Sequence, residues 1–176
     1  MWNVMTLDGY FEGSRNWDLS FHEIIWGEEV SQIGLKQLRS ADFLVFGRVA
    51  FEGMAAHWKK EKGETAVLMN ELPKIVFSRT LEKADWRNST LIKENPSAKI
   101  RELKQQGDGD MFVFGSAILS ETLMKDDLFD EYRLVVAPVI LGEGRPLFSK
   151  GIINKKLTLI SAQTLSTGGV ILIYGK

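Results

Sequence analysis

The amino-acid sequence predicts an α/β fold with a mostly parallel central sheet and antiparallel strands at its C-terminal edge. Through the first two-thirds of the chain, short apolar segments alternate with amphipathic ones, which is typical of strand–helix–strand units. Three apolar segments, 131–140, 156–165 and 169–175, then follow without long helices between them, and this order favours antiparallel pairing. The 176 residues are 44% hydrophobic, which is enough for a full core. We therefore expect a single domain over residues 1–176.

The first predicted elements follow from local patterns. Residues 1–7 predict a strand that ends at Asp8-Gly9, a pair common in turns. Apolar residues at helical spacing predict an amphipathic helix over 21–39. A buried strand over 43–46 then runs directly into a helix that begins with residues 49–54.

The middle of the chain repeats this order. The apolar segment 74–78 predicts a strand, followed by a polar loop. Asn95-Pro96 provides a start for a helix over 97–106, because proline is favoured in the first helical turn. Residues 111–114 predict another strand, and residues 116–124 a helix that follows it at once.

Composition excludes several classes of function. The chain has 22 basic and 23 acidic residues and a net charge of −1, which argues against general binding to nucleic acid or to anionic membranes. It has no cysteine, and His22 and His57 fit no metal-ligand spacing, so we expect no metal site. No apolar segment reaches the roughly 18 residues of a membrane span, and no signal peptide is visible. We expect a cytoplasmic protein.

Small or basic residues follow three of the buried strands. They are Gly47-Arg48, Ser78-Arg79 and Gly115-Ser116-Ala117. In open α/β sheets, ligands bind beyond the carboxyl ends of the strands. Small side chains let a ligand approach the backbone, free amides of a first helical turn attract phosphate, and arginine adds charge-assisted hydrogen bonds. The pattern is compatible with a nucleotide site, but equally with glycines that serve packing and arginines that serve as surface caps.

A resemblance identifies the family. The segment DEYRLVVAPVILGEGRPLF, residues 130–148, resembles the late motif of the dihydrofolate reductase-like family typified by the reductase domain of the bifunctional riboflavin-synthesis enzyme. Four further segments match motifs of that family in the same order: 6–13, 44–54, 75–81 and 113–124. Together the matches cover nearly the whole chain.

The resemblance implies a three-layer dihydrofolate reductase-like fold that binds NADPH. In such a fold, the helix start at Gly47, Arg48, Val49 and Ala50 and the loop at Ser78 and Arg79 hold the adenosine phosphates, with Ser78 donating to the 2′-phosphate. The residues expected to line the pyrophosphate are Gly115, Ser116, Ala117 and Ile118, and those expected near the nicotinamide are Met5 and Thr6.

The sequence departs from the family pattern in three respects. Ala50 replaces a threonine, which removes one hydroxyl donor to phosphate. Ser116 replaces the second glycine of the pyrophosphate turn, which a negative φ at this position would allow. The zinc ligands of the deaminase half of the bifunctional enzyme are absent, so we expect no deaminase chemistry here.

Asp8 is the candidate catalytic acid and a candidate substrate-binding residue, because it belongs to the Leu-Asp-Gly motif at the end of the first strand. The alternative is that it only closes a turn with Gly9. Trp17 and Asp18 are further candidates for binding the substrate. The alternative for Trp17 is packing in the core, and the alternative for Asp18 is capping the N-terminus of a helix. The turn Leu141–Arg145 is specific but has no assigned role; a loop beside the substrate or at a dimer interface is our interpretation.

These observations lead to one main functional hypothesis. The chain is expected to be an NADPH-dependent reductase resembling 5-amino-6-(5-phosphoribosylamino)uracil reductase of riboflavin biosynthesis, with a small pyrimidine- or pteridine-like substrate. Dihydrofolate reductase proper is an alternative, but no carboxylate matches the one that its first helix provides. Another is a nucleotide-binding homodimer without catalysis. A homodimer is expected in each case, and the sequence does not name the substrate.

Overall fold

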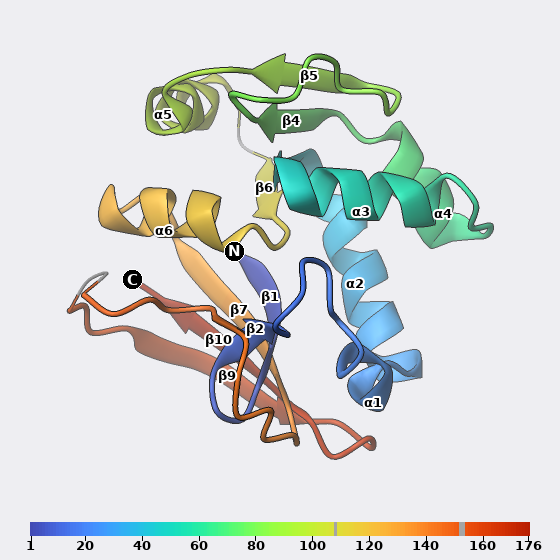
Figure 1. Ribbon diagram of the computed structural model, residues 1–176, viewed down its shortest axis with the longest axis vertical. Coiled ribbons are helices and arrows are strands. Elements are labelled where there is room, and N and C mark those ends of the chain that lie inside the picture. The colour runs from blue at the N-terminus through green and yellow to red at the C-terminus, as the bar shows by residue number, and fades with distance from the viewer. Residues whose placement is uncertain (108, 152–153) are drawn as a thin grey trace.

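The strands of the protein form a divided central sheet flanked by helices (Figure 1). This computed structural model describes residues 1–107, 109–151 and 154–176. The described strands are β1 (Trp2–Thr6), β2 (Tyr10–Glu12), β3 (Ala41–Gly47), β4 (Lys74–Phe77), β5 (Ser89–Ile92), β6 (Asp110–Val113), β7 (Glu131–Ala137), β8 (Arg145–Pro146), β9 (Thr158–Thr164) and β10 (Val170–Gly175). The described helices are α1 (His22–Ile25), α2 (Glu28–Ser40), α3 (Arg48–Trp58), α4 (Glu64–Glu71), α5 (Pro96–Gln106) and α6 (Ala117–Lys125).

Parallel pairs dominate one half of the sheet and antiparallel pairs the C-terminal edge. The order β5-β4-β3-β6 is parallel throughout. The second half has the order β1-β7-β10-β9, in which β1 and β7 are parallel and the last two pairs are antiparallel. The predicted fold class is therefore confirmed.

An isolated parallel bridge between Trp2 and Phe114 joins the two halves. Phe114 comes directly after β6, whereas Trp2 is the first residue of β1. Consequently β1 begins at the level where β6 ends, and the start of β1 lies at the carboxyl edge of the parallel half. This offset decides which residues of β1 reach the functional site.

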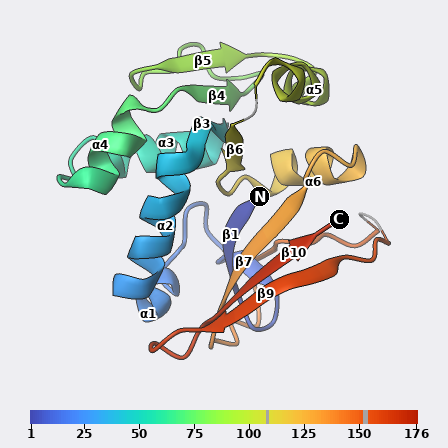
Figure 2. The same ribbon diagram turned by 180° about the vertical axis from the view of Figure 1, so that it is seen from behind.

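Helices cover both faces of the sheet, as the two opposite views show (Figures 1 and 2). α1 to α4 lie on one side, and α5 and α6 lie on the other. Side chains alternate between the faces of a strand, so consecutive residues of β3 enter different cores. Phe46 packs with Phe51 of α3 and with Trp86, whereas Val45 belongs to the other core cluster, together with Leu123 of α6.

The structure differs from the predicted elements in a few places. The helix expected over 21–39 is interrupted at Trp26 and Gly27, whose extended backbones separate α1 from α2. The loop expected after β4 contains the edge strand β5, whose residues are only partly buried, so its sequence lacks a strong apolar pattern. α4 and the β2–β8 pair were not expected from the pattern either, because each is too short to show a clear periodicity.

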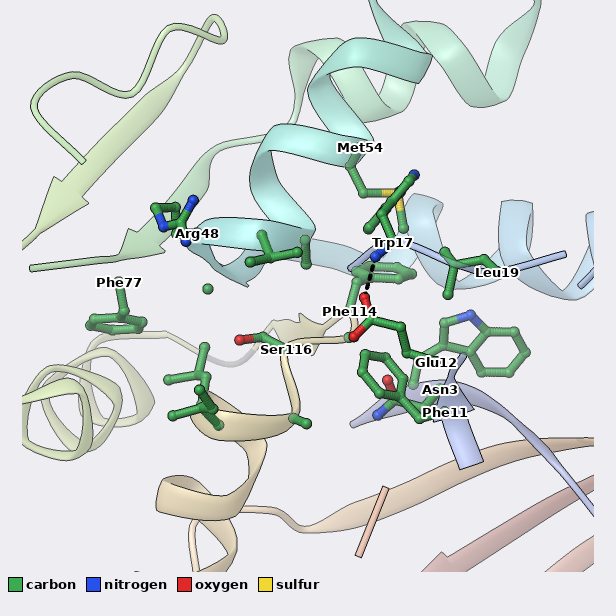
Figure 3. A pocket seen from close by; sticks show the side chains of 18 of the residues that line it. Asn3, Phe11, Glu12, Trp17, Leu19, Arg48, Met54, Phe77, Phe114 and Ser116 are labelled. Atoms are coloured by element: carbon green, nitrogen blue, oxygen red, sulfur yellow. Dashed lines mark hydrogen bonds between the residues drawn. The ribbon is translucent and has the colours of Figure 1, made fainter. Parts of the chain in front are cut away.

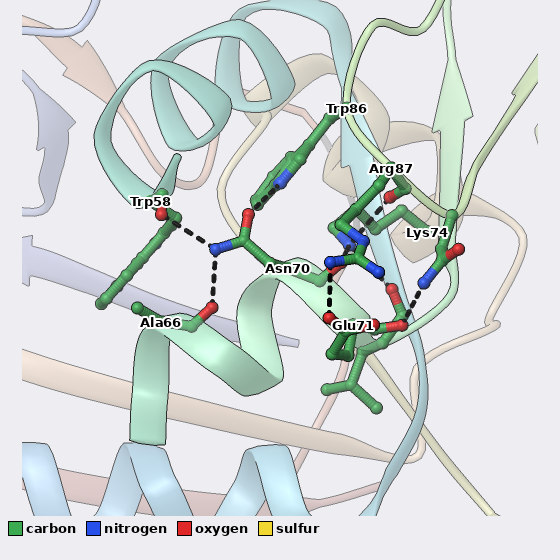
Figure 4. A network of polar contacts seen from close by, with 9 residues as sticks. Trp58, Ala66, Asn70, Glu71, Lys74, Trp86 and Arg87 are labelled. Atoms are coloured by element: carbon green, nitrogen blue, oxygen red, sulfur yellow. Dashed lines mark hydrogen bonds and ion pairs between the residues drawn. The ribbon is translucent and has the colours of Figure 1, made fainter. Parts of the chain in front are cut away.

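Lys74, the first residue of β4, is completely buried. Its ammonium nitrogen donates to the carbonyl oxygens of Asn70, Leu72 and Arg87 at 2.8–3.2 Å and lies 4.5 Å from the centre of the Trp86 ring. Figure 4 shows this network at the end of α4. Burial lowers the pKa of Lys74 to about 8. The lysine thus satisfies carbonyl groups at the end of α4 that the helix itself leaves free.

The edge strand β9 is exposed along its whole length and includes the apolar side chains of Leu159 and Ile160. An exposed edge strand is able to pair with another chain, but homodimer formation stays a prediction. None of the described helices is long and apolar enough to cross a membrane.

Candidate functional site

A cavity of about 890 Å³ lies at the carboxyl edge of the parallel half-sheet. The ends of β3, β4 and β6 border it on one side, and β1, β2, α1 and α2 on the other. Figure 3 shows its lining between the starts of α3 and α6. Because parallel strands end at the same edge of a sheet, segments distant in sequence meet here.

All ten residues predicted for the phosphates and the adenosine line this cavity. They are Gly47, Arg48, Val49, Ala50, Ser78, Arg79, Gly115, Ser116, Ala117 and Ile118. Lys93 adds another basic side chain to the same lining. The local sequence at each strand end pointed to this part of the lining, which β3, β4 and β6 build, and the family resemblance singled out the same residues.

Two helices begin at the cavity without side-chain caps. Within the described residues, neither Gly47, the N-cap of α3, nor Ser116, the N-cap of α6, makes a side-chain cap hydrogen bond, and neither helix has an acidic residue in its first turn. The first amides of a helix carry partial positive charge and need acceptors. Two such helix starts at one cavity are able to bind an anion such as a phosphate group.

The polar side chains near these helix starts are partly occupied by their neighbours. The guanidinium of Arg48 lies 2.9 Å from the carboxylate of Glu52, one helical turn further on. The hydroxyl oxygen of Ser78 accepts from the backbone N–H groups of Thr80 and Leu81 at 3.2 and 2.9 Å. This arrangement shapes the loop that carries Arg79, and the Thr80 hydroxyl lies 3.5 Å from that of Ser78, so either hydroxyl is able to donate to the other.

Ser116 adopts a left-handed backbone with φ of +59°, so the negative φ that would make serine tolerable at this position is not found. Gly115 is also left-handed, at +61°, and the two residues together turn the chain sharply from β6 into α6. The turn lies against β3, because a Cβ atom on Gly47 would meet the Ser116 hydroxyl oxygen at 2.0 Å. Figure 3 shows the Ser116 hydroxyl pointing into the cavity.

The other end of the cavity is aromatic. Phe11, Trp17, Trp26 and Phe114 are among its lining residues. Trp17 has a φ of +64° and lies against α3 at Gly53, where an added Cβ would be only 2.3 Å from the indole ring. Flat apolar walls of this kind suit a flat heterocycle.

Asp18 does not appear among the described residues that line the cavity. Its carboxylate accepts a hydrogen bond from the Ser20 hydroxyl at 3.1 Å and lies 3.7 Å from Arg15. Its backbone carbonyl accepts from Gly13. Asp18 therefore closes the loop that positions Trp17, and of these two candidates the structure brings only Trp17 to the cavity.

Glu12 is a cavity carboxylate that the sequence analysis did not select. It is 3% exposed, and its carboxylate accepts the backbone N–H of Trp17 and lies 3.2 Å from the Arg145 guanidinium. Arg145 itself lines the cavity. It belongs to the turn for which the sequence showed no role, and the pairing of β2 with β8 brings it to Glu12. The sequence offered one signal for Glu12, namely an acidic residue directly after the aromatic pair Tyr10-Phe11.

Asp8 lies elsewhere: it is not among the described lining residues. Its carboxylate accepts from the Thr6 hydroxyl at 2.5 Å and from the backbone N–H groups of Leu141 and Gly142 at 2.8–3.2 Å. These hydrogen bonds, the one from Thr6 first, lower its pKa. Asp8 thus anchors the turn that leads to Arg145 and does not face the cavity.

Replacing Asp8 with asparagine should lower Tm at pH 7, because the amide accepts the N–H groups of the turn less well than the carboxylate does. A lowered folded-state pKa means that this stabilisation is present above the ordinary value of 3.8 and is lost as the pH falls below it. Thermal denaturation at pH 7 and pH 3 should show the difference in Tm narrowing at the lower pH. Glu143→Gln, on the same exposed turn, is the control; an unchanged Tm for Asp8→Asn at pH 7 would contradict the anchoring role.

Met5 and Thr6 also fall outside the described lining. The offset of β1 explains this, since its first residues, Trp2, Asn3 and Val4, already lie at the carboxyl edge and line the cavity. Met5 and Thr6 continue beyond that edge.

Two buried polar atoms of lining residues lack a hydrogen-bond partner among the described residues, the Asn3 side-chain nitrogen Nδ2 and the His22 nitrogen Nε2. Burial lowers the pKa of His22 to about 4, so its ring is neutral at pH 7. The described residues contain no cluster of three or more histidine or acidic side chains able to hold a metal ion.

Comparison with known proteins agrees with this architecture. The family model described as the RibD C-terminal domain matches residues 1–171. The chain belongs to the RibD C-terminal domain family. A relative of this RibD-type domain is the uncharacterized protein YyaP of Bacillus subtilis (strain 168), 30% identical over 177 residues, with 97% of this chain and 90% of YyaP covered.

Solved structures share the fold of this RibD-type domain. A putative riboflavin biosynthesis protein from Shewanella sp. PV-4 has a TM-score of 0.79 at 20% identity, with 99% of this chain and 96% of that chain covered. A diaminohydroxyphosphoribosylaminopyrimidine deaminase/5-amino-6-(5-phosphoribosylamino)uracil reductase from Thermotoga maritima has a TM-score of 0.67 at 13% identity. The match covers 98% of this chain and 54% of that chain. Dihydrofolate reductase from Enterococcus faecalis, complexed with NADP(H), has a TM-score of 0.65 at 11% identity. The match covers 98% of this chain and 92% of that chain.

Proposed function

We propose that this protein is an NADPH-dependent reductase that acts on a small pyrimidine- or pteridine-like heterocycle, similar to 5-amino-6-(5-phosphoribosylamino)uracil reductase. The observation that carries the proposal is the joint lining of one cavity by Gly47-Arg48, Ser78-Arg79 and Gly115–Ile118. One end of the cavity thus offers groups that bind phosphates, and the other end is aromatic. Membership in the RibD C-terminal domain family supports the same reaction class.

The donor set fits NADPH. Two uncapped helix starts supply backbone amides for the pyrophosphate, and Arg48 and Arg79 supply guanidinium groups for the phosphates of the adenosine end. In our proposal Ser78 and Arg79 bind the 2′-phosphate. Bound NADPH would supply the hydride, and the protein would orient it and exclude water.

The aromatic end fits the acceptor of the hydride. Phe11, Trp17 and Phe114 offer apolar surfaces for a flat ring. We assign to Glu12, rather than to Asp8, the carboxylate that accepts an N–H of the heterocycle, because of these two only Glu12 borders the cavity. Arg145 keeps this carboxylate in place at 3.2 Å.

The contribution of the first helices argues against dihydrofolate reductase proper. The described residues of α2 that line the cavity are Val30, Ser31, Gly34 and Leu38, and none of them is a carboxylate. A nucleotide-binding protein without catalysis would share the phosphate-binding end, and a turnover assay with candidate heterocycles separates it from a reductase.

A thermal-shift titration with NADPH and NADH tests the cofactor. Stabilisation should grow with the logarithm of the NADPH concentration above Kd and be weaker for NADH. No stabilisation by either dinucleotide would exclude the reductase function.

Arg79→Ala should weaken NADPH binding by about tenfold, the usual effect of losing one charge-assisted hydrogen bond, and leave NADH binding nearly unchanged. Isothermal titration calorimetry with both dinucleotides measures the two affinities. Arg87→Ala is the matched control, because Arg87 pairs with Glu71 at 2.6 Å outside the described cavity lining. An equal loss of NADPH and NADH affinity in Arg79→Ala would refute the assignment of Arg79 to the 2′-phosphate.

A further inference from the structure

Asn3 is a buried polar side chain with an unused hydrogen-bond donor. It is 3% exposed, and its nitrogen Nδ2 has no partner among the described residues. The buried Asn70 behaves differently: its amide nitrogen donates to two carbonyls, and its oxygen accepts from Trp86. Leaving a buried donor unpaired costs free energy, so the unpaired donor of Asn3 indicates a ligand group that accepts from it.

The position of Asn3 indicates which ligand group this is. Asn3 lines the cavity, and because Trp2 pairs with Phe114, Asn3 lies at the level of Gly115. It is therefore next to the turn proposed for the pyrophosphate. In Figure 3 it appears beside Phe11 and Glu12, at the aromatic end and away from Arg48.

We propose that Asn3 Nδ2 donates a hydrogen bond to an oxygen of the nicotinamide half of NADPH, on its carboxamide or its ribose. This inference rests on the proposed function. With the adenosine phosphates at Arg48 and Arg79 and the pyrophosphate at Gly115–Ile118, the other half of the dinucleotide extends toward β1, where Asn3 presents its free donor. Carboxamide and ribose oxygens are acceptors that match this donor.

Binding of two probes to the full chain tests the proposal. NADP⁺ contains the nicotinamide half, whereas 2′,5′-ADP contains only the adenosine end. In Asn3→Leu, which has a similar volume but no donor, the Kd for NADP⁺ should rise about tenfold, and the Kd for 2′,5′-ADP should stay unchanged. Asn3→Asp should behave in the same way, because it replaces the donor with an acceptor, and it carries the test if the leucine variant does not fold. An unchanged Kd for NADP⁺ in the folded variants would overturn the proposal.

Two further readouts separate a ligand-binding role from a structural one. Without ligand, Asn3→Leu should have a Tm equal to or above that of the wild type, because it removes an unpaired buried donor. A lower Tm together with weaker binding of both probes would show a structural role and overturn the proposal. Tyr132→Phe is the matched control: it removes another buried polar atom that has no partner among the described residues, outside the described cavity lining, and should leave both affinities unchanged.

Failure of the proposed function has a different signature. If the wild type binds neither 2′,5′-ADP nor NADP⁺, the NADPH assignment is wrong, and the role of Asn3 is overturned with it. If the wild type binds both probes and the Asn3 variants retain full NADP⁺ affinity, only the inference about Asn3 is wrong.

Discussion

Replacing Lys74 with methionine should lower the free energy of unfolding by about 3 kcal/mol. Methionine keeps the apolar stem that packs on Trp86, but it leaves the carbonyl oxygens of Asn70, Leu72 and Arg87 without their donor. Buried groups that lose their partner cost more than the net value of the hydrogen bond itself. Urea denaturation at pH 7 measures the change. Arg39→Ala is the control. Arg39 of α2 forms an exposed ion pair with Glu64 at the start of α4, and the loss of this pair should change the free energy of unfolding by less than about 1 kcal/mol.

The difference between Lys74→Met and the wild type should also depend on pH. Burial lowers the pKa of Lys74 to about 8, against the ordinary value of 10.5 that applies in the unfolded chain. Between these two values the unfolded chain binds a proton that the folded chain does not, so the wild type gains stability with rising pH through this group. The methionine variant lacks this gain, and its deficit should therefore be larger at pH 10 than at pH 7. A deficit that is equal at both pH values would contradict the lowered pKa.

Gly47→Ala should destabilise the protein by about 2 kcal/mol and weaken NADPH binding by at least tenfold. The backbone of Gly47, with φ of −86°, suits any residue, so the effect is purely steric. The new Cβ would lie 2.0 Å from the hydroxyl oxygen and 2.8 Å from the Cβ of Ser116. Relief of this overlap requires α3 and α6 to move apart at their N-termini, where the proposed phosphates bind. Chemical denaturation and calorimetric titration with NADPH measure the two effects.

A second substitution should reverse the loss. In Gly47→Ala/Ser116→Gly the overlapping atoms are absent, so both stability and NADPH affinity should recover, and the two substitutions should be strongly non-additive. Ser116→Gly alone should stabilise the protein by about 1 kcal/mol, because a left-handed residue favours glycine. Gly34→Ala is the control: it also lines the cavity, but nothing lies within 4 Å of its added Cβ, and alanine in a helix should be neutral or stabilising. A double variant no better than Gly47→Ala would refute the steric explanation.

The edge of the candidate site that β3, β4 and β6 form could be predicted because each part of it is local. Gly47-Arg48, Ser78-Arg79 and Gly115-Ser116 lie at the ends of β3, β4 and β6 or within three residues after them, and parallel strands bring such ends to one edge of a sheet. The apolar segments likewise identified the strands of the sheet, and their order along the chain predicted parallel pairs first and antiparallel pairs last. These features depend on residues within a few positions of one another.

The second half of the site depends on contacts between distant segments. Glu12 and Arg145 meet only because β2 pairs with β8, and Asp8 is engaged by a turn more than 130 residues further along the chain. The single bridge from Trp2 to Phe114 sets the offset of β1, which brings Asn3 to the cavity and takes Met5 and Thr6 beyond it. Local periodicity in the sequence predicted the fold class, and the small and basic residues at the strand ends made this edge a candidate site, which the family resemblance then assigned to the phosphates of NADPH. Only the tertiary structure decided which carboxylate and which residues of the first strand face the cavity, because register and pairing between distant strands are set by packing of the whole sheet.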